Sequence, residues 1–423
     1  MTKTDWKKCK LGDVCYPVSE TYNFSNREKV VFINTGDISF GKFLKKEYEP
    51  VVSLPGQAKK SIQKNDILFS EIRPANGRFA LVDFDAQDFV VSTKLMVLRS
   101  RQIIDLKFLY LLLTNKYTLA EFQHIAESRS GTFPQITFDA ISYFPISLPP
   151  LDEQKRIAEV LGAFDDKIEL LQKQNKTLED MAKALFKSWF VDFDVVHAKQ
   201  KGLPKADIMR EYHLTEELYD LFPFSFADSP LGPIPSGWEV KPLSKIATFL
   251  NGLALQKYPA RAEEDFLPVI KIAELRNGIS TSTDKANTNL PTEYIVHNGD
   301  ILFSWSGSLM VKVWSGEKGA LNQHLFKVLS NGYPKWFYYL WVNHYLPMFQ
   351  EIAADKATTM GHIQRKHLDQ AKVVCPSAAF LDKMDKIFGV ILSKIILNNK
   401  QIQTLTELRD SLLPRLISGK IRV

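Results

Sequence analysis

The chain contains few of the residues that support disulfide or metal-centred folds. Its 423 residues include only three cysteines, Cys9, Cys15 and Cys375. An odd, scattered set without a Cys-x-x-Cys pair argues against a disulfide framework or a zinc site. Apolar runs such as 336–342 are far shorter than the roughly 18–20 residues that span a bilayer. The N-terminus has no signal-peptide pattern, so we expect a soluble protein of the cytoplasm.

Sequence signatures of catalysis are missing as well. The chain has no GxxxxGK[ST] loop for phosphates, no GxG turn for a dinucleotide or S-adenosylmethionine, and no Asn- or Asp-Pro-Pro-Tyr for a flipped base. Glu153-Gln154-Lys155 resembles the Glu-x-Lys of nucleases. It opens a predicted helix, however, and we interpret it as a solvated helix face. Asp165 and Asp166 are helix neighbours that point in different directions. We therefore expect no catalytic residue, metal or cofactor on this chain.

Composition points to a globular protein with more than one domain. Apolar residues make up 45% of the chain and charged residues 24%, which excludes wholesale disorder. The net charge is only +6, with two mildly basic blocks separated by an acidic connector. This distribution permits a polyanionic partner without requiring one.

The sequence repeats itself. Shifting it by 227 positions places 113–185 on 340–412 without a gap, and identical residues then coincide along the whole window. They include Leu113/Leu340, Phe122/Phe349, Gln123/Gln350, Ile136/Ile363, Pro149/Pro376, Lys167/Lys394, Leu178/Leu405 and Leu185/Leu412. Upstream, the run Asp-Ile-Leu-Phe-Ser recurs at 66–70 and 300–304, and Trp6 matches Trp238. Each half is thus a variable globular part followed by a better-matched segment.

The variable parts have mixed secondary structure. Short β-rich runs bounded by Gly, Asn and Asp predict strands at 29–33, 67–69, 89–91 and 95–98, and at 269–272, 301–303, 312–314 and 325–329. Aromatic and leucine residues recurring every three or four positions predict a helix at 105–127 in the first half and one at 334–355 in the second.

A heptad pattern predicts two long helices, at 151–190 and 378–416. The first apolar seam comprises Ile157, Leu161, Phe164, Ile168, Leu171, Asn175, Leu178, Ala182 and Leu185. The second comprises Met384, Phe388, Ile391, Ile395, Asn398, Ile402, Leu405, Arg409 and Leu412. The lone asparagines, Asn175 and Asn398, occupy non-equivalent repeat positions, so a parallel alignment in repeat register would leave each facing an apolar residue, whereas an antiparallel pair could bring them together. Homodimerisation through one helix is the alternative.

These patterns predict an α+β fold. Two α/β domains, related by an internal pseudo-two-fold repeat, would be separated by two long antiparallel coiled-coil helices. We expect a domain at 1–150, a spacer helix at 151–190, an acidic, proline-containing surface linker at 191–235 with one short helix near 215–221, a second domain at 236–377, the second spacer helix at 378–416 and a tail at 417–423.

The motifs resemble those of one family. The runs GTFPQI at 131–136, ISLPPLDEQKRIA at 146–158, DDKIEL at 165–170 and KSWFVDFD at 187–194 are similar to the central region of the DNA-specificity subunit of type I restriction–modification enzymes. PSGW at 235–238 and LLPRLISGKI at 412–421 resemble the start of its second recognition domain and its C-terminus. The chain departs from the family at 382–387, where DKMDKI replaces the EQKRI pattern, and at Val195, where proline is usual.

The resemblance implies a non-catalytic protein that binds double-stranded DNA. Each target-recognition domain would read one half of a split, asymmetric sequence. Two modification (methyltransferase) subunits carrying S-adenosylmethionine would dock on the helices, and two restriction subunits using ATP and Mg²⁺ would complete the complex. The spacer helices would hold the domains about one DNA turn, roughly 34–36 Å, apart.

Polar and basic loop positions beside the matched strands are the candidate DNA contacts, because Arg pairs with guanine, Asn and Gln with adenine, and Lys with phosphate. In the first half they are Arg73, Asn76, Arg78, Lys94, Arg129, Ser130, Thr132 and Gln135. In the second they are Ser304, Trp305, Ser306, Ser308, Lys312, Gln323, His324, Lys356, Thr358, Thr359 and Gln364. For any one of them, an ordinary solvated loop residue is the competing interpretation.

Two other functions stay open at this level. One is a self-contained DNA methyltransferase or nuclease with diverged motifs, which would turn over DNA alone. The other is a coiled-coil scaffold that binds no nucleic acid.

Overall fold

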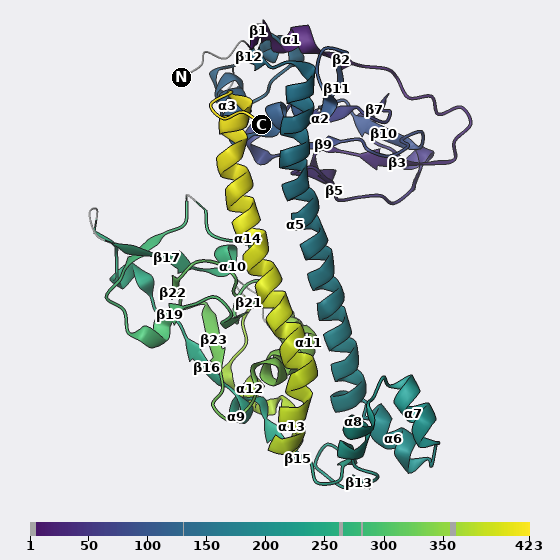
Figure 1. Cartoon of the computed structure of the whole chain (residues 1–423), viewed down its shortest axis with the longest axis vertical. Coiled ribbons are helices and arrows are strands. Elements are labelled where there is room, and N and C mark those ends of the chain that lie inside the picture. The colour runs from purple at the N-terminus through teal and green to yellow at the C-terminus, as the bar shows by residue number, and fades with distance from the viewer. Residues whose placement is uncertain (1–5, 130, 262–264, 281, 356–360) are drawn as a thin grey trace. The chain divides into compact units, whose positions relative to one another are not determined.

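The computed structural model describes all residues except 1–5, 130, 262–264, 281 and 356–360 (Figure 1). Its contacts divide the chain into two compact units, residues 1–166 with 405–423, and residues 167–404. The long helices α5 (Leu151–Phe186) and α14 (Val390–Ile417) contribute residues to both units. None of the helices within the described ranges is long and apolar enough to span a bilayer.

The first unit contains small, mostly antiparallel sheets. Its strands pair in the orders β1–β12, β2–β11–β8–β9, β6–β3–β10–β7 and β4–β5, and only β3 and β10 run parallel among these described pairs. The strands are β1 (Lys7–Lys10), β2 (Cys15–Val18), β3 (Lys29–Ile33), β4 (Ile38–Ser39), β5 (Lys42–Phe43), β6 (Glu49–Pro50), β7 (Ala58–Ser61), β8 (Ile67–Ser70), β9 (Phe79–Leu81), β10 (Phe89–Ser92), β11 (Leu95–Ser100) and β12 (Pro145–Leu148). The strands expected at 29–33, 67–69, 89–91 and 95–98 all lie within these elements.

Helices cover the β2–β11–β8–β9 sheet of the first unit. They are α1 (Leu11–Val14), α2 (Leu106–Thr114), α3 (Lys116–Arg129) and α4 (Phe138–Ile141). The single helix expected at 105–127 is therefore wrong, because it breaks at Asn115. The Asn115 side chain donates to the Leu112 carbonyl (2.6 Å) and accepts from the Thr118 amide (2.9 Å). An asparagine that satisfies backbone groups in this way ends one helix and begins the next.

The second unit repeats this topology. Its matching sheets have the orders β15–β24, β16–β23–β20–β21 and β18–β17–β22–β19, with β17 and β22 parallel as β3 and β10 are, and the unit has a further two-stranded sheet, β13–β14. The strands are β13 (Phe226–Ala227), β14 (Ile234–Pro235), β15 (Glu239–Pro242), β16 (Thr248–Asn251), β17 (Phe266–Ile270), β18 (Lys285–Asn287), β19 (Ile295–Val296), β20 (Ile301–Ser304), β21 (Val311–Val313), β22 (Gly319–Leu321), β23 (Leu325–Leu329) and β24 (Lys372–Cys375). The internal repeat predicted from the sequence is thus present in the strand order of each unit.

Two predicted strands of the second unit extend too far, since the run 312–314 passes the end of β21 at Val313 and the run 269–272 passes the end of β17. The run 269–272 ends as strand at Ile270, and Ile272 begins helix α10 (Ile272–Asn277). The Lys271 amide donates to the Glu274 carboxylate (3.1 Å). This contact caps the helix and ends the strand.

The expected surface linker is a folded helical segment. Residues 191–235 contain α6 (Asp194–Gln200), α7 (Lys205–Glu211) and α8 (Glu216–Leu221), of which only the last was predicted. Val195, Ile208 and Phe222 are almost completely buried. These apolar residues are spaced over several short helices, so no one helix shows a long periodic pattern from which burial could be recognised. The unit also contains α9 (Leu243–Ile246), α11 (Lys335–Asp355), α12 (Arg365–Gln370) and α13 (Ala378–Met384).

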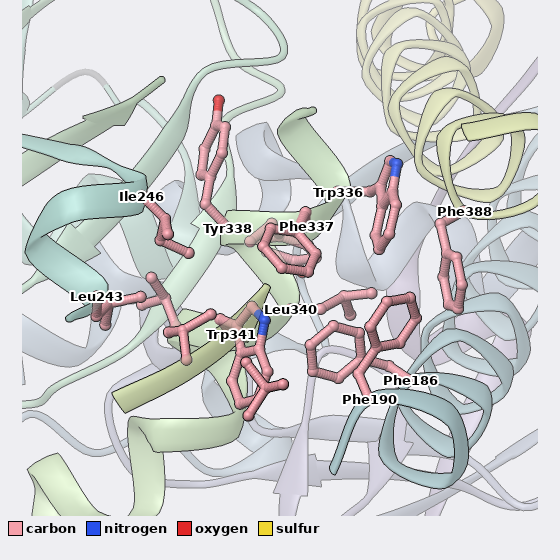
Figure 2. Close-up of a cluster of buried hydrophobic side chains, with 14 of the residues drawn as sticks. Phe186, Phe190, Leu243, Ile246, Trp336, Phe337, Tyr338, Leu340, Trp341 and Phe388 are labelled. Carbon is pink, nitrogen blue, oxygen red and sulfur yellow. The ribbon is translucent and has the colours of Figure 1, made fainter. Parts of the chain in front are cut away.

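An aromatic core holds the second unit together. Figure 2 shows Phe186 and Phe190 beside Phe388 and the side chains of α11. The Trp336 ring stacks on the Phe388 ring, with centroids 4.6 Å apart, and the centroid of the Phe190 ring lies 5.9 Å from that of Phe388. The helix 334–355 predicted from its aromatic stripe is α11, and its stripe is core.

The two long helices pair antiparallel within each unit. In the second unit, Asn175 bonds to Asn398 while Phe186 packs on Phe388. In the first unit, Arg409 donates to Asp165 (2.6 Å). All seam residues are buried or half-buried: Ile157, Leu161, Phe164, Leu405 and Leu412 in the first unit, and Ile168, Leu171, Asn175, Leu178, Leu185, Phe388, Ile391, Ile395, Asn398 and Ile402 in the second.

The start of α5 differs from the solvated face expected for Glu153-Gln154-Lys155. Glu153 and Gln154 are buried, and only Lys155 is exposed. Glu153 accepts from the Trp6 indole (3.2 Å), while Gln154 accepts from the Asp105 amide (2.7 Å) and donates to the Pro149 carbonyl (2.9 Å). The two side chains therefore fasten the helix to the domain that precedes it.

Candidate nucleic-acid interface

The repeated Asp-Ile-Leu-Phe-Ser run forms the same buried strand in both units. Just before β8, Asp66 is fully buried, pairs with Arg99 (2.8 Å) and accepts from the Gln63 amide (2.9 Å). Just before β20, Asp300 pairs with Lys327 (2.8 Å) and accepts from the His297 amide (2.8 Å). The aspartate thus closes the turn that leads into the strand, which accounts for its recurrence.

The loop after each of these strands is fixed by an equivalent pair of backbone hydrogen bonds. In the first unit, Ile136 N donates to Glu71 O (2.8 Å) and Arg73 N to Pro134 O (3.1 Å). In the second, Ile363 N donates to Trp305 O (3.0 Å) and Gly307 N to Gly361 O (2.8 Å). We call residues 71–78 with 132–136, and residues 305–310 with 361–364, the first and second loop frames.

A matched glutamine ties each frame to the helix behind it. Gln123 of α3 accepts from the Ala75 amide (3.2 Å), and Gln350 of α11 donates to the Leu309 carbonyl (3.0 Å). The amide side chain can serve as acceptor in one frame and donor in the other. This explains the Gln123/Gln350 identity, which sequence reasoning found without assigning it a role.

A buried serine closes each loop at its base. Ser70 accepts from the Ile72 amide (3.0 Å), and Ser304 accepts from the Met310 amide (2.8 Å) while donating to the Ser308 carbonyl (2.7 Å). Ser304 is fully buried, so this predicted contact residue has a structural position inside the frame.

In the first frame, Arg73 and Asn76 are exposed and Arg78 is not free. Arg73 has a left-handed backbone (φ 43°), which is uncommon outside glycine and asparagine. Arg78 donates to the Gly36 and Ile38 carbonyls (3.2 and 2.8 Å), so its guanidinium holds the neighbouring hairpin. Arg73 and Asn76 are thus the first-frame side chains best placed for an external partner.

Of the other first-half candidates, Thr132 and Gln135 belong to this frame, while Lys94 and Arg129 lie outside it. Gln135 is half-buried and bridges to Ile72, Thr132 is exposed, and Arg129 donates to Thr137 (3.3 Å). Lys94 is half-buried, and its backbone carbonyl accepts a hydrogen bond from the Glu71 amide (3.0 Å). Ser130 lies outside the described residues.

Trp305 and Ser306 of the second frame belong to an aromatic and imidazole cluster with residues outside the frame. The Trp305 indole donates to Asn251 Oδ1 (2.9 Å) and to the Gln323 carbonyl (3.1 Å). Ser306 Oγ lies 3.0 Å from His324 Nδ1, and the Trp305 and His324 rings are 6.0 Å apart. The structure therefore brings Trp305, Ser306, Gln323 and His324 together, with Ser306 buried among them. Asn251 was missed, because it lies at the end of β16, far from the frame in sequence.

The remaining second-half candidates are dispersed. Ser308 is exposed in the loop, and Gln364 is exposed at the start of α12. Lys312 donates to the Arg276 carbonyl (3.1 Å), and burial lowers the pKa of its amine. Lys356, Thr358 and Thr359 lie outside the described residues. Within the described ranges, no group of three or more His, Cys, Asp and Glu side chains could hold a metal ion.

The chain thus consists of two units of one repeated α/β fold, each with an equivalent loop frame, and paired helices contribute to both units. A family model described as "Type I restriction modification DNA specificity domain" matches residues 3–180 and 235–407. The chain belongs to this family and has the role of a specificity subunit.

Individual relatives agree with this assignment. The specificity subunit of the type I restriction enzyme HindI of Haemophilus influenzae is 34% identical over 463 residues, spanning 99% of this chain and 100% of that protein. The MjaIX specificity subunit of Methanocaldococcus jannaschii is 28% identical and spans 75% of this chain and 69% of that protein. The crystal structure of a type I S subunit from M. genitalium covers 99% of this chain and 97% of its own, with a TM-score of 0.55 at 16% identity, and shows the same fold.

Proposed function

We propose that the two loop frames each read one half of a bipartite, asymmetric DNA sequence. The observation that carries the proposal is that the frames share their backbone hydrogen bonds but not their side chains. Glu71, Ile72 and Arg73 of the first frame correspond to Trp305, Ser306 and Gly307 of the second. Equal scaffolds with unequal side chains suit two sites of the same kind that recognise different bases.

The chemistry of the exposed side chains differs between the frames. Arg73 and Asn76 offer the groups that pair with guanine and adenine in the major groove, each pair contributing about 1–3 kcal/mol of discrimination. The second frame offers the exposed hydroxyl of Ser308. Beside it in the same unit lie the half-buried side chains of Gln323 and His324, and the Ser306 hydroxyl is buried against the His324 imidazole. The half-sites read by the two units should therefore differ, which makes the complete target asymmetric.

Partner subunits would supply the chemistry. The chain would be non-catalytic and would bind no cofactor itself. Two modification subunits using S-adenosylmethionine and two restriction subunits using ATP and Mg²⁺ would assemble on its helices. The exposed apolar side chains of α5 and α14, among them Leu170, Met181 and Leu397, support a role for these helices in assembly. Such a complex would act in the cytoplasm, where its DNA substrate lies.

The proposal is tested with the chain co-purified with its modification subunit. Fluorescence anisotropy should show binding to one DNA sequence that is at least about 10³-fold tighter than to scrambled DNA, and that weakens steeply as salt rises from about 50 to 200 mM. Equal affinity for all sequences, or no binding, would contradict it and favour a scaffold. Methylation or cleavage of DNA by the chain alone would favour a self-contained enzyme.

A further inference from the structure

An aromatic side chain at the edge of the first loop frame has no structural explanation within its own hairpin. Strands β4 and β5 are joined by Phe40 and Gly41, which both have positive φ angles of 43° and 85°. Two-residue hairpin turns with this backbone strongly favour Asn-Gly, because asparagine tolerates the left-handed region and a phenylalanine does not. The hairpin therefore holds a bulky aromatic at the position where it is most strained.

The frame itself holds this residue in place. Phe40 N donates to the Gly77 carbonyl (2.7 Å), and Gly41 N donates to the Phe79 carbonyl (2.9 Å). From the other side, the Arg78 guanidinium donates to the Gly36 and Ile38 carbonyls. The hairpin tip and the loop that presents Arg73 and Asn76 are thus one hydrogen-bonded body.

The ring of Phe40 lies on the backbone of this loop. A Cβ atom added at Gly77 would come within 2.4 Å of the Phe40 ring, so glycine is needed there for the contact. The ring meets Phe79 edge-on, with centroids 5.9 Å apart. Even so, 66% of Phe40 is exposed. Side chains held in strained backbone and kept exposed are concentrated at functional sites, where binding compensates for their cost.

We propose that Phe40 is a base-contacting residue of the first target-recognition domain, and that it packs against the C5-methyl group of a thymine in the half-site. The inference rests on the proposed function. Major-groove readers place apolar side chains on thymine methyl groups beside the hydrogen-bonding side chains that read neighbouring bases. Phe40 stands in this relation to Arg73 and Asn76, since all three belong to the same hydrogen-bonded body.

The test uses the complex with the modification subunit and DNA in which each thymine of the target is replaced by uracil, which lacks only the methyl group. One replacement in the first half-site should weaken wild-type binding about 3–5-fold, which corresponds to the free energy gained by burying one methyl group. Phe40→Asn suits the turn and preserves folding. This variant should bind the thymine target about 5–20-fold more weakly and should not distinguish thymine from uracil.

The control variant replaces an exposed aromatic residue that lies outside the loop frame. Tyr117, equally exposed at 66% on helix α3, should be replaceable by alanine without loss of affinity or of uracil sensitivity. The inference is overturned if Phe40→Asn binds like the wild type, if it keeps the full response to uracil, or if the first half-site contains no thymine. Failure of the proposed function would look different, because the wild-type complex would then show no sequence preference at all.

Discussion

Replacing Asn398 by leucine should destabilise the second unit, although it places an apolar residue in an apolar seam. Asn398 is fully buried and donates to Asn175 Oδ1 (2.9 Å), while Asn175 donates to Asn399 Oδ1 (2.7 Å). The substitution leaves Asn175 Oδ1 buried without this donor, which costs about 1–3 kcal/mol. Asn175→Leu should cost a similar amount, because it removes the acceptor of the buried Asn398 amide group.

The double variant gives the sharper result. With both seam amides replaced by leucine, neither leaves the other unpaired, and half-buried Asn399 can turn to water. The double variant should therefore be about as stable as the wild type or more so, as when a buried polar seam pair is made apolar. The two substitutions would then be coupled by about 2 kcal/mol or more.

This coupling is measured by urea unfolding of the wild type, the two single variants and the double variant. The fluorescence of the tryptophans packed around Phe388 reports the unfolding. Additive effects of the two substitutions would refute the reasoning. The restored stability should come with lost register, so the double variant in its complex should tolerate DNA targets whose two halves are one base pair nearer or farther apart.

Three further predictions follow from single contacts. Asp66→Ala should lower the free energy of unfolding of the first unit by about 3 kcal/mol in urea unfolding, because it removes the buried partner of Arg99 and of the Gln63 amide. A decrease below about 0.5 kcal/mol would contradict the role of Asp66 in closing the turn. Arg73→Ala should leave stability within about 0.5 kcal/mol but lower discrimination at one half-site by about 1–3 kcal/mol, and unchanged specificity in a binding selection would exclude Arg73 as a base contact. Burial raises the pKa of the Cys15 thiol to about 12 and that of Cys375 to about 11. These two thiols should not react with a disulfide reagent near pH 8 until the chain is unfolded. The free energy of unfolding should fall as the pH rises past about 9, because the thiols of the unfolded chain lose their protons at a lower pH than the buried ones. Rapid reaction of all three cysteines in the native protein would contradict this.

The elements that the sequence predicted are those whose residues carry a local pattern. The heptad seams, the aromatic stripe of 334–355 and the strand after Asp66 depend on spacing alone, and each lies where expected. The break at Asn115 depends on which backbone groups one amide reaches. Burial of Glu153 and Gln154 depends on Trp6 and Asp105, which are distant in sequence. Neither kind of contact has a periodic signal.

The positions of the two loop frames were predictable to a similar extent. The loops after the repeated strands could be located, because the repeat marks them. The functions of individual side chains could not be predicted. Arg78 holds the neighbouring hairpin and Ser304 closes its own loop, and Phe40 and Gly41 are joined to the first frame by hydrogen bonds from their amides to the Gly77 and Phe79 carbonyls.

The central claim is that this chain selects a two-part DNA sequence for a modification subunit. It is tested most directly by mapping methylated bases across the genome of the source organism with and without the gene for this chain. The account predicts that one asymmetric motif, made of two specified halves separated by unspecified bases, loses its methylation when the gene is deleted. An unchanged methylation pattern, or the loss of a single continuous motif, would contradict it.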